Sequence, residues 1–249
     1  MRAFLLHSYA QVLKMVNNKE EICVIIPARS GSKGIPDKNI KDIRGKSLLI
    51  RALEAANQIV DIQNICLSTD SEKCYEHIKP NFSPIFLKRS EYLSQDNSLA
   101  IDVWKDVINY LELKNKKFNY SIFLEPTSPM RNIKWIEEKI NEFIKSDDDL
   151  WMSIKETDSK YRIEKQFKIE KNGDIKKLYK DDEVYSLRQN SFPTYHKDGV
   201  FYIAKNEYIV KTKKLFGGKI KGIINHHQSV NIDTLEDLNY AKYLFTKNK

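Results

Sequence analysis

The sequence predicts an α/β fold with a mainly parallel β-sheet and flanking helices. Short apolar runs, typical of buried strands, alternate along the chain with longer segments whose apolar residues recur at helical spacing. This order requires helical crossovers between parallel strands. The length of 249 residues favours one domain, and a hydrophobic content of 41% is that of a globular protein.

The first half of the chain supplies three strands and two helices. Residues 22–26 are an unbroken apolar run rich in β-branched residues, which predicts a buried strand. Residues 47–60 carry leucines and alanines on one face and predict a helix. An apolar run at 64–68 predicts the second strand, 71–78 a helix, and 84–87 a short third strand.

The middle of the chain repeats the alternation. Residues 99–111 carry one apolar stripe and predict a helix, and an apolar strand follows at 120–124. Two prolines stop that strand abruptly. Asn132 is a suitable N-cap for a helix over 133–145, and 150–154 predicts another strand.

The composition changes between about residues 156 and 182, where lysines and glutamates surround short β-like pieces. The pair Asn172-Gly173 has strand-like flanks, including 167–170, and therefore predicts a hairpin. This segment predicts a small β-rich arm inserted into the domain.

After the arm, the chain returns to the pattern of the domain. Strands are predicted at 200–204 and 220–224. Thr234 and Asp237 form a capping-box-like start for a last helix over 235–245. The predicted organisation is thus a domain over residues 21–249 that contains the arm.

Residues 1–20 are predicted to be an N-terminal extension. Their apolar pattern is irregular and no small-residue cleavage site follows, which argues against a signal peptide. Two interpretations stay open for this extension, a short amphipathic helix or an over-long reading frame with Met15 as the natural start.

The net charge and the cysteine count limit the possible partners and the cellular compartment. The formal charge of +8 is compatible with binding to a nucleic acid. It is also compatible with binding to an anionic nucleotide by a chain that is generally rich in lysine. The lysines are scattered along the sequence, which favours the nucleotide. Cys23 and Cys66 lie in apolar runs, and Cys74 completes an odd count without paired metal spacing. No apolar run has the length of a membrane span, so we expect a cytoplasmic protein without nucleic-acid or membrane partners.

The loop after the first strand is the most informative segment. Gly31 and Gly34 allow tight turns and close backbone approach, and Arg29, Lys33 and Lys38 add positive charge. At the carboxyl end of a buried strand, this combination suits a polyphosphate. The loop contains neither the P-loop pattern nor the G-x-G-x-x-G fingerprint. The alternative interpretation is a solvated basic turn.

This loop closely resembles the signature of the acylneuraminate cytidylyltransferases, in which Ala-Arg-x-x-Ser-Lys-Gly-x-Pro-x-Lys-Asn follows the first strand. The matching positions are Ala28, Arg29, Ser32, Lys33, Gly34, Pro36, Lys38 and Asn39. The resemblance implies that the loop binds the nucleotide. It also implies that Arg29, Lys33 and Lys38 are catalytic, stabilising the phosphates and the departing pyrophosphate.

Residues 124–131 resemble the family segment Leu-Gln-Pro-Thr-Ser-Pro-Leu-Arg. The resemblance implies that Glu125, Thr127 and Ser128 contact the acceptor. Glu125 stands where the family has glutamine, and an ionised glutamate accepts hydrogen bonds without donating them. This substitution predicts an altered acceptor preference. A plain strand-to-helix turn is the alternative interpretation of the segment.

Two further segments resemble family elements. Arg89 and Asp96 fit the spacing of a nucleotide-holding pair, although a surface arginine with a helix N-cap fits equally well. Other residues resemble the family's Arg-Gln…Asn-Gly-x-x-Tyr element, which contacts the acceptor; they are Arg188, Gln189, Asp198 and Tyr202. Arginine suits a carboxylate because its planar fork binds bidentately. By default, Tyr202 is a packed aromatic.

Residues 230–238 resemble the family's Ile-Asp-Ile-Asp-Thr-x-x-Asp-Leu segment. Asn231 and Asp233 point to one side of an extended chain and predict a site for magnesium or another divalent cation. Asp233 is the stronger ligand, whereas Asp237 fits a helix cap. The adjacent pair His226-His227 points opposite ways and is predicted to be structural.

Taken together, the resemblance implies a Rossmann-like sheet, a homodimer built by the arm, and CMP transfer from CTP to an acidic nine-carbon sugar. Two rivals stay open. One is a cytidylyltransferase for another acidic acceptor, such as a legionaminate, pseudaminate, Kdo-like acid or phosphonate. The other is a non-catalytic nucleotide-binding paralogue.

Overall fold

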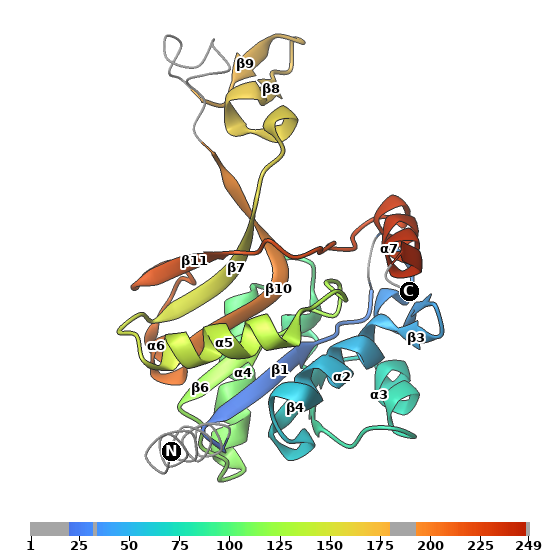
Figure 1. Cartoon of the computed structure of the whole chain (residues 1–249), viewed down its shortest axis with the longest axis vertical. Coiled ribbons are helices and arrows are strands. Elements are labelled where there is room, and N and C mark those ends of the chain that lie inside the picture. The colour runs from blue at the N-terminus through green and yellow to red at the C-terminus, as the bar shows by residue number, and fades with distance from the viewer. Residues whose placement is uncertain (1–19, 32–33, 180–192, 248–249) are drawn as a thin grey trace, which may run out of the picture.

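The computed structural model describes residues 20–31, 34–179 and 193–247, and its centre is a seven-stranded sheet with helices on both faces (Figure 1). The strands of this sheet are β1 (Ile22–Pro27), β4 (Ile65–Thr69), β5 (Ile85–Lys88), β6 (Tyr120–Phe123), β7 (Leu150–Glu156), β10 (Tyr195–Lys205) and β11 (Ile220–Ile224). Their spatial order is β11-β7-β10-β6-β1-β4-β5.

The sheet is mainly parallel, which confirms the predicted fold class. β1 pairs in parallel with β4 and β6, β4 with β5, and β7 with β11. β10 runs antiparallel to both β6 and β7. As a result, the early residues of β10 reach the edge of the sheet where β1 and β6 end.

The helices of the described chain begin and end close to the predicted positions, except for a short helix at Asn206–Lys211 that was not predicted. They are α2 (Leu48–Ile59), α3 (Glu72–Ile78), α4 (Ala100–Leu113), α5 (Ile133–Ile144), α6 (Asn206–Lys211) and α7 (Leu235–Lys247). Short 3-10 turns occur at Lys38–Ile40, Ile62–Asn64, Tyr92–Ser94, Ser159–Tyr161 and Ile163–Lys165. The predicted cap of α5 is confirmed, because Asn132 Oδ1 accepts a hydrogen bond from Trp135 N at 3.0 Å. No helix in the described ranges is long and apolar enough to cross a membrane.

Alternating side chains of β1 divide the core into two layers. Val24 and Ile26 pack with α2, α3 and α5 on one face, whereas Cys23 and Ile25 pack with α4 and α6 on the other. Cys23, Cys66 and Cys74 are free and buried, as expected for core cysteines. Burial raises the pKa of the Cys66 thiol to about 12, so this group is inert at neutral pH.

The predicted arm leaves the sheet as an extension of β7 and β10 (Figure 1). Its far end carries a hairpin of β8 (Phe167–Ile169) and β9 (Ile175–Lys177), which confirms the prediction from Asn172-Gly173. Gly173 has a φ of +91°, a conformation that favours glycine in this turn.

One small hairpin was not predicted. β2 (Asp42–Ile43) and β3 (Lys46–Ser47) join through Arg44 and Gly45, both at positive φ. Two-residue strands carry too little periodicity to be recognised in a sequence. Ile43 of this hairpin belongs to an apolar cluster that also contains Leu238 and Ala241 of α7.

Candidate active site

The site is a pocket of about 580 Å³ at the edge of the sheet where β1 and β6 end. Segments far apart in the sequence form its walls: the loop after β1, the segment between β5 and α4, the turn after β6, the bulged part of β10, and the approach to α7. The carboxyl ends of parallel strands are the usual place for ligands in open α/β sheets.

Hydrogen bonds anchor the start of the loop after β1. Ala28 N donates to Ser68 O at 2.9 Å, and Thr69 Oγ1 donates to Ala28 O. Ser30 N donates to Asp70 Oδ1 at 2.7 Å. Buried Asn39 holds the start of the loop, since its Nδ2 donates to Arg29 O at 2.9 Å. The loop is therefore positioned by β4 and by its own continuation.

Gly34 is required by a close approach of two backbone segments. A Cβ added to Gly34 would lie 2.3 Å from the carbonyl oxygen of Asp233, so no larger residue fits without moving the chain. This contact brings the glycine loop against the segment before α7. The predicted residues Ser32 and Lys33 lie outside the described residues.

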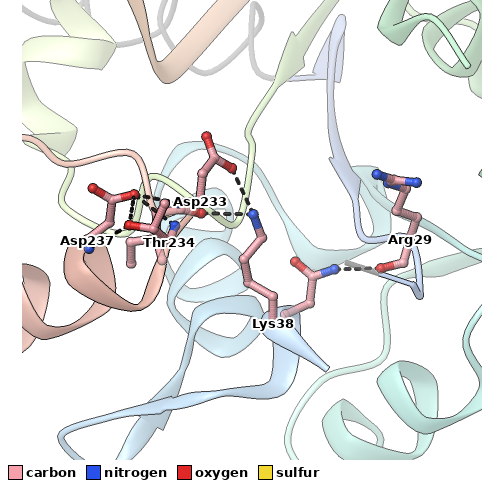
Figure 2. A network of polar contacts seen from close by, with 7 residues as sticks. Arg29, Lys38, Asp233, Thr234 and Asp237 are labelled. Carbon is pink, nitrogen blue, oxygen red and sulfur yellow. Dashed lines mark hydrogen bonds and ion pairs between the residues drawn. The ribbon is translucent and has the colours of Figure 1, made fainter. Parts of the chain in front are cut away.

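Lys38 and Asp233 form the central ion pair of the pocket. Figure 2 shows the ammonium group of Lys38 pointing toward Asp233, with 2.9 Å between Lys38 Nζ and Asp233 Oδ1. Lys38 Nζ also donates to Ile232 O at 2.9 Å. The Lys38 side chain is only 12% exposed, whereas Asp233 is 68% exposed and open to the pocket.

Asp237 fixes the backbone beside this pair (Figure 2). Its Oδ2 accepts from Asp233 N at 3.0 Å and Thr234 N at 2.9 Å, and Asp237 N donates to Thr234 Oγ1. Burial opposes ionisation of Asp237, yet the two backbone N–H groups hold its pKa below the usual range. The predicted capping box is confirmed, and it orients the residue that pairs with Lys38.

A second ion pair lies across the pocket. Arg29 Nη1 lies 2.8 Å from Asp96 Oδ1. Arg89 is buried, and its guanidinium donates to Ser68 Oγ at 3.1 Å and to Ser68 O at 2.7 Å. Burial lowers the pKa of Arg89 to about 10, so it still carries its charge at neutral pH.

A half-buried arginine holds the turn after β6. Arg131 donates through Nε to Val200 O at 2.9 Å and through Nη2 to Glu125 O at 2.5 Å. Burial lowers the pKa of Arg131 to about 10. Ile232 N donates to Thr127 O at 2.9 Å, which ties the turn to the Asp233 segment.

Two predicted acceptor residues lie behind the pocket wall. Buried Ser128 donates from Oγ to Asp198 O at 2.8 Å. Asp198 is buried too, and its carboxylate accepts from Ser153 Oγ and from Asn225 Nδ2, the latter at 2.6 Å. The side chains of both residues are engaged in holding β10, so the structure gives them a supporting place.

Most other predicted residues come together in the pocket. Its wall includes Arg29, Gly34, Lys38, Asn39, Arg89, Asp96, Glu125, Thr127, Tyr202, Asn231 and Asp233. Tyr202 is also a packed aromatic, with its ring edge-on to Phe123 at 6.3 Å between centroids, and burial raises its pKa. Ala28 is buried beneath the loop. Arg188 and Gln189 lie outside the described residues.

Several pocket residues were not predicted. Lys197 comes from β10, while Gln95 and Ser98 come from the segment before α4. The Asp-Gly pair that follows Lys197 is a turn signal, and it was the available sign that β10 is irregular there. The histidine pair lies elsewhere, where His227 packs on Trp135.

The residues of the Asp233 segment fit a magnesium site of the kind completed by substrate phosphates. Asn231 and Asp233 both line the pocket and offer one amide oxygen and one carboxylate. Magnesium is usually held by one or two carboxylates together with phosphates and water. Within the described ranges no cluster of three or more His, Cys, Asp or Glu side chains forms a complete protein cage.

Glu125→Gln is expected to stabilise the protein in a pH-dependent way. Burial raises the pKa of Glu125, and the charges of Lys197 and Arg131 oppose this only in part. An ionised Glu125 therefore lowers the free energy of unfolding above its raised pKa, and this cost vanishes below the ordinary value of 4.5. The melting-temperature gain of the variant should grow from acid to neutral pH.

Thermal denaturation across that pH range measures the effect. Glu112→Gln on α4 is a matched control, because Glu112 is exposed and distant from the pocket lining. A constant difference between Glu125→Gln and the unmodified protein at every pH would contradict the prediction.

Comparisons with known proteins agree with this geometry. The sequence model of a family described as cytidylyltransferase matches residues 23–249. Pseudaminic acid cytidylyltransferase of Campylobacter jejuni is 27% identical over 225 residues, which cover 90% of this chain and 96% of that protein. N-acylneuraminate cytidylyltransferase of Streptococcus agalactiae serotype III is 30% identical over 224 residues, covering 87% of this chain and 51% of the relative.

A solved structure supports the fold. CMP:2-keto-3-deoxy-manno-octonic acid synthetase, solved in complex with CTP, superposes with a TM-score of 0.69 at 16% identity. The match covers 92% of this chain and 100% of that one. The resemblance to acylneuraminate cytidylyltransferases is thus confirmed by a match over nearly the whole chain, and the chain belongs to the cytidylyltransferase family.

Proposed function

We propose that this chain transfers CMP from CTP to the anomeric hydroxyl of an acidic nine-carbon sugar and releases pyrophosphate. The observation that carries the proposal is the pocket itself. It gathers Arg29, Lys38, Arg89 and Asp233 at the strand ends of a cytidylyltransferase fold. Three cations at this position are suited to an anionic triphosphate.

In this reaction the sugar hydroxyl attacks the α-phosphorus in line, and the bond to the bridging oxygen of pyrophosphate breaks. Positioning and charge neutralisation supply most of the catalysis in phosphoryl-transfer chemistry. Arg29 and Lys38 stabilise the phosphates, and Lys33 joins them on the basis of its place in the family signature. Asp233 and Asn231 would hold magnesium, which would neutralise phosphate charge.

The acceptor occupies the side of the pocket formed by the turn after β6 and by β10. Glu125, Thr127 and Tyr202 line this side. Arg188 and Gln189 are proposed to contact the acceptor from the sequence resemblance alone. The names of the two relatives point to acidic nine-carbon sugars as a class, and Glu125 favours an acceptor that presents a hydrogen-bond donor.

The proposed assembly is a homodimer formed through the arm. The arm hairpin exposes Phe167, Ile169 and Ile175, with 50%, 72% and 64% of each residue accessible. An isolated two-stranded hairpin is marginally stable in water, so an apolar face of this kind needs a partner surface. The buried, unpaired cysteines of the described chain fit a reducing compartment such as the cytoplasm.

Pyrophosphate release tests the proposed function. Purified protein is incubated with CTP, magnesium and one acidic sugar at a time, including N-acetylneuraminate, pseudaminate, legionaminate and 3-deoxy-octulosonate. We expect metal-dependent release with at least one nine-carbon acid, and a CMP-sugar product by mass spectrometry. Tight CTP binding without pyrophosphate release from any acceptor would instead identify a non-catalytic nucleotide-binding protein.

A further inference from the structure

The wall of the pocket formed by β10 is irregular at one place. Opposite β7, the pairing register shifts between Lys197 and Tyr202. Gly199 has a φ of +69° within this bulge, and a Cβ on it would lie 2.6 Å from Glu125 Oε2. The carboxylate of Glu125 is therefore packed directly against the glycine backbone of the bulge.

Asp198 anchors the bulge from its buried side. Its Oδ1 accepts from Val200 N at 3.1 Å, and its Oδ2 accepts from Asn225 Nδ2 at 2.6 Å. While Asp198 is held in the protein interior, its neighbours Lys197 and Gly199 line the pocket. The position of Lys197 thus follows from a buried hydrogen-bond network and a glycine conformation.

Lys197 and Glu125 differ from Arg29 and Lys38 in their ion pairing. Arg29 pairs with Asp96, and Lys38 pairs with Asp233. By contrast, no ion pair within 4.0 Å joins Lys197 or Glu125 to another described residue. Lys197 nevertheless supplies the strongest of the positive charges that act on Glu125.

We propose that Lys197 and Glu125 together determine acceptor specificity: Lys197 Nζ binds the carboxylate of the sugar, and Glu125 accepts a hydrogen bond from a hydroxyl or amide N–H of the same molecule. The inference rests on the proposed function, because it requires an acidic sugar in the pocket. An ionised Glu125 alone would repel an anionic acceptor, since like charges interact strongly where water is partly excluded. Lys197 offsets that repulsion and gives the acceptor a counter-charge.

Lys197→Met tests the assignment by separating the two substrates. We expect KM for the acceptor to rise by about tenfold or more, the scale for losing a hydrogen bond to a charged group. KM for CTP should change by less than about twofold, because the nucleotide-side cations remain in place. Lys213→Met is the matched control, since Lys213 is exposed and is not part of the pocket lining.

A double variant distinguishes binding from simple neutralisation of Glu125. If Lys197 contacts the acceptor, Glu125→Gln combined with Lys197→Met keeps the raised acceptor KM. If Lys197 only neutralises Glu125, the double variant returns to the KM of Glu125→Gln alone, and the inference is overturned. Lys197→Arg keeps the charge and should keep an acceptor KM within about threefold of the unmodified enzyme.

The outcomes distinguish failure of the proposed function from failure of the Lys197 assignment alone. Unmodified protein that releases no pyrophosphate with any acceptor overturns the proposed function and this inference with it. Active unmodified protein whose Lys197→Met variant keeps its acceptor KM, or raises only the KM for CTP, overturns this inference alone. Melting temperatures of all variants establish that each compared protein is folded.

Discussion

Replacing Lys38 with methionine is expected to lower kcat by at least about a hundredfold, the scale for removing one preorganised electrostatic group. The ammonium group of Lys38 has two roles in the pocket. It donates to Ile232 O and Asp233 Oδ1, each at 2.9 Å, and it places a positive charge where a triphosphate is expected to bind. Methionine keeps the length of the side chain but removes both roles.

Steady-state kinetics with saturating CTP and acceptor measure this loss. Lys41→Met is the matched control, because Lys41 is an exposed lysine three residues further along that does not line the pocket. Far-ultraviolet circular dichroism and a melting curve verify the fold of both variants. A folded Lys38→Met protein with kcat within about twofold of the unmodified enzyme would exclude Lys38 from catalysis.

Local signals made the secondary structure predictable. The apolar run of β1, the Asn132 cap of α5 and the Thr234–Asp237 capping box each act within a few residues of chain, and the structure confirms all three. The Asn172-Gly173 turn belongs to the same class, since two residues determine the hairpin. Short-range chemistry of this kind does not depend on the rest of the fold.

The shape of the pocket depends on long-range contacts, and here the sequence was less informative. Lys38 and Asp233 are 195 positions apart, and the resemblance to a family placed them in one site without giving their distance. In a regular strand, successive side chains point to opposite faces of the sheet. The pairing register then decides which face the side chain of Asp198 occupies. The bulge at Gly199 changes that relation, so Lys197 lines the pocket and the Asp198 side chain is buried behind it.

The direction of β10 could not be predicted from the sequence either. Its core residues are apolar, as they are in the parallel strands, and an apolar run does not reveal strand direction. The direction is set by the arm, because the chain leaves the sheet along β7 and returns along β10 as a ribbon. This return brings Lys197 and Gly199 to the strand ends where the pocket forms.

Removing the arm hairpin is expected to convert a dimer into monomers and to lower activity by about a hundredfold, the scale for a misplaced catalytic group. The hairpin has two chemically different faces. Ile169 pairs with Ile175 and Phe167 pairs with Lys177 on one face, where Phe167 and both isoleucines are exposed. Lys168 pairs with Lys176 on the other face, where both lie near Glu170. An exposed, mainly apolar face opposite a charged one indicates a surface that is covered in the assembled protein.

The deletion is designed around a contact that already closes the hairpin. Leu178 N donates to Gln166 O at 3.1 Å, so residues 167–177 can be replaced by an Asn-Gly turn without pulling the flanking chain apart. Multi-angle light scattering measures the mass, and pyrophosphate release measures activity. Ile169→Lys should reproduce the loss of the dimer, whereas Lys168→Gln on the opposite face should leave it intact. A deletion variant that is monomeric and fully active would contradict the proposal that a partner arm completes or braces the site.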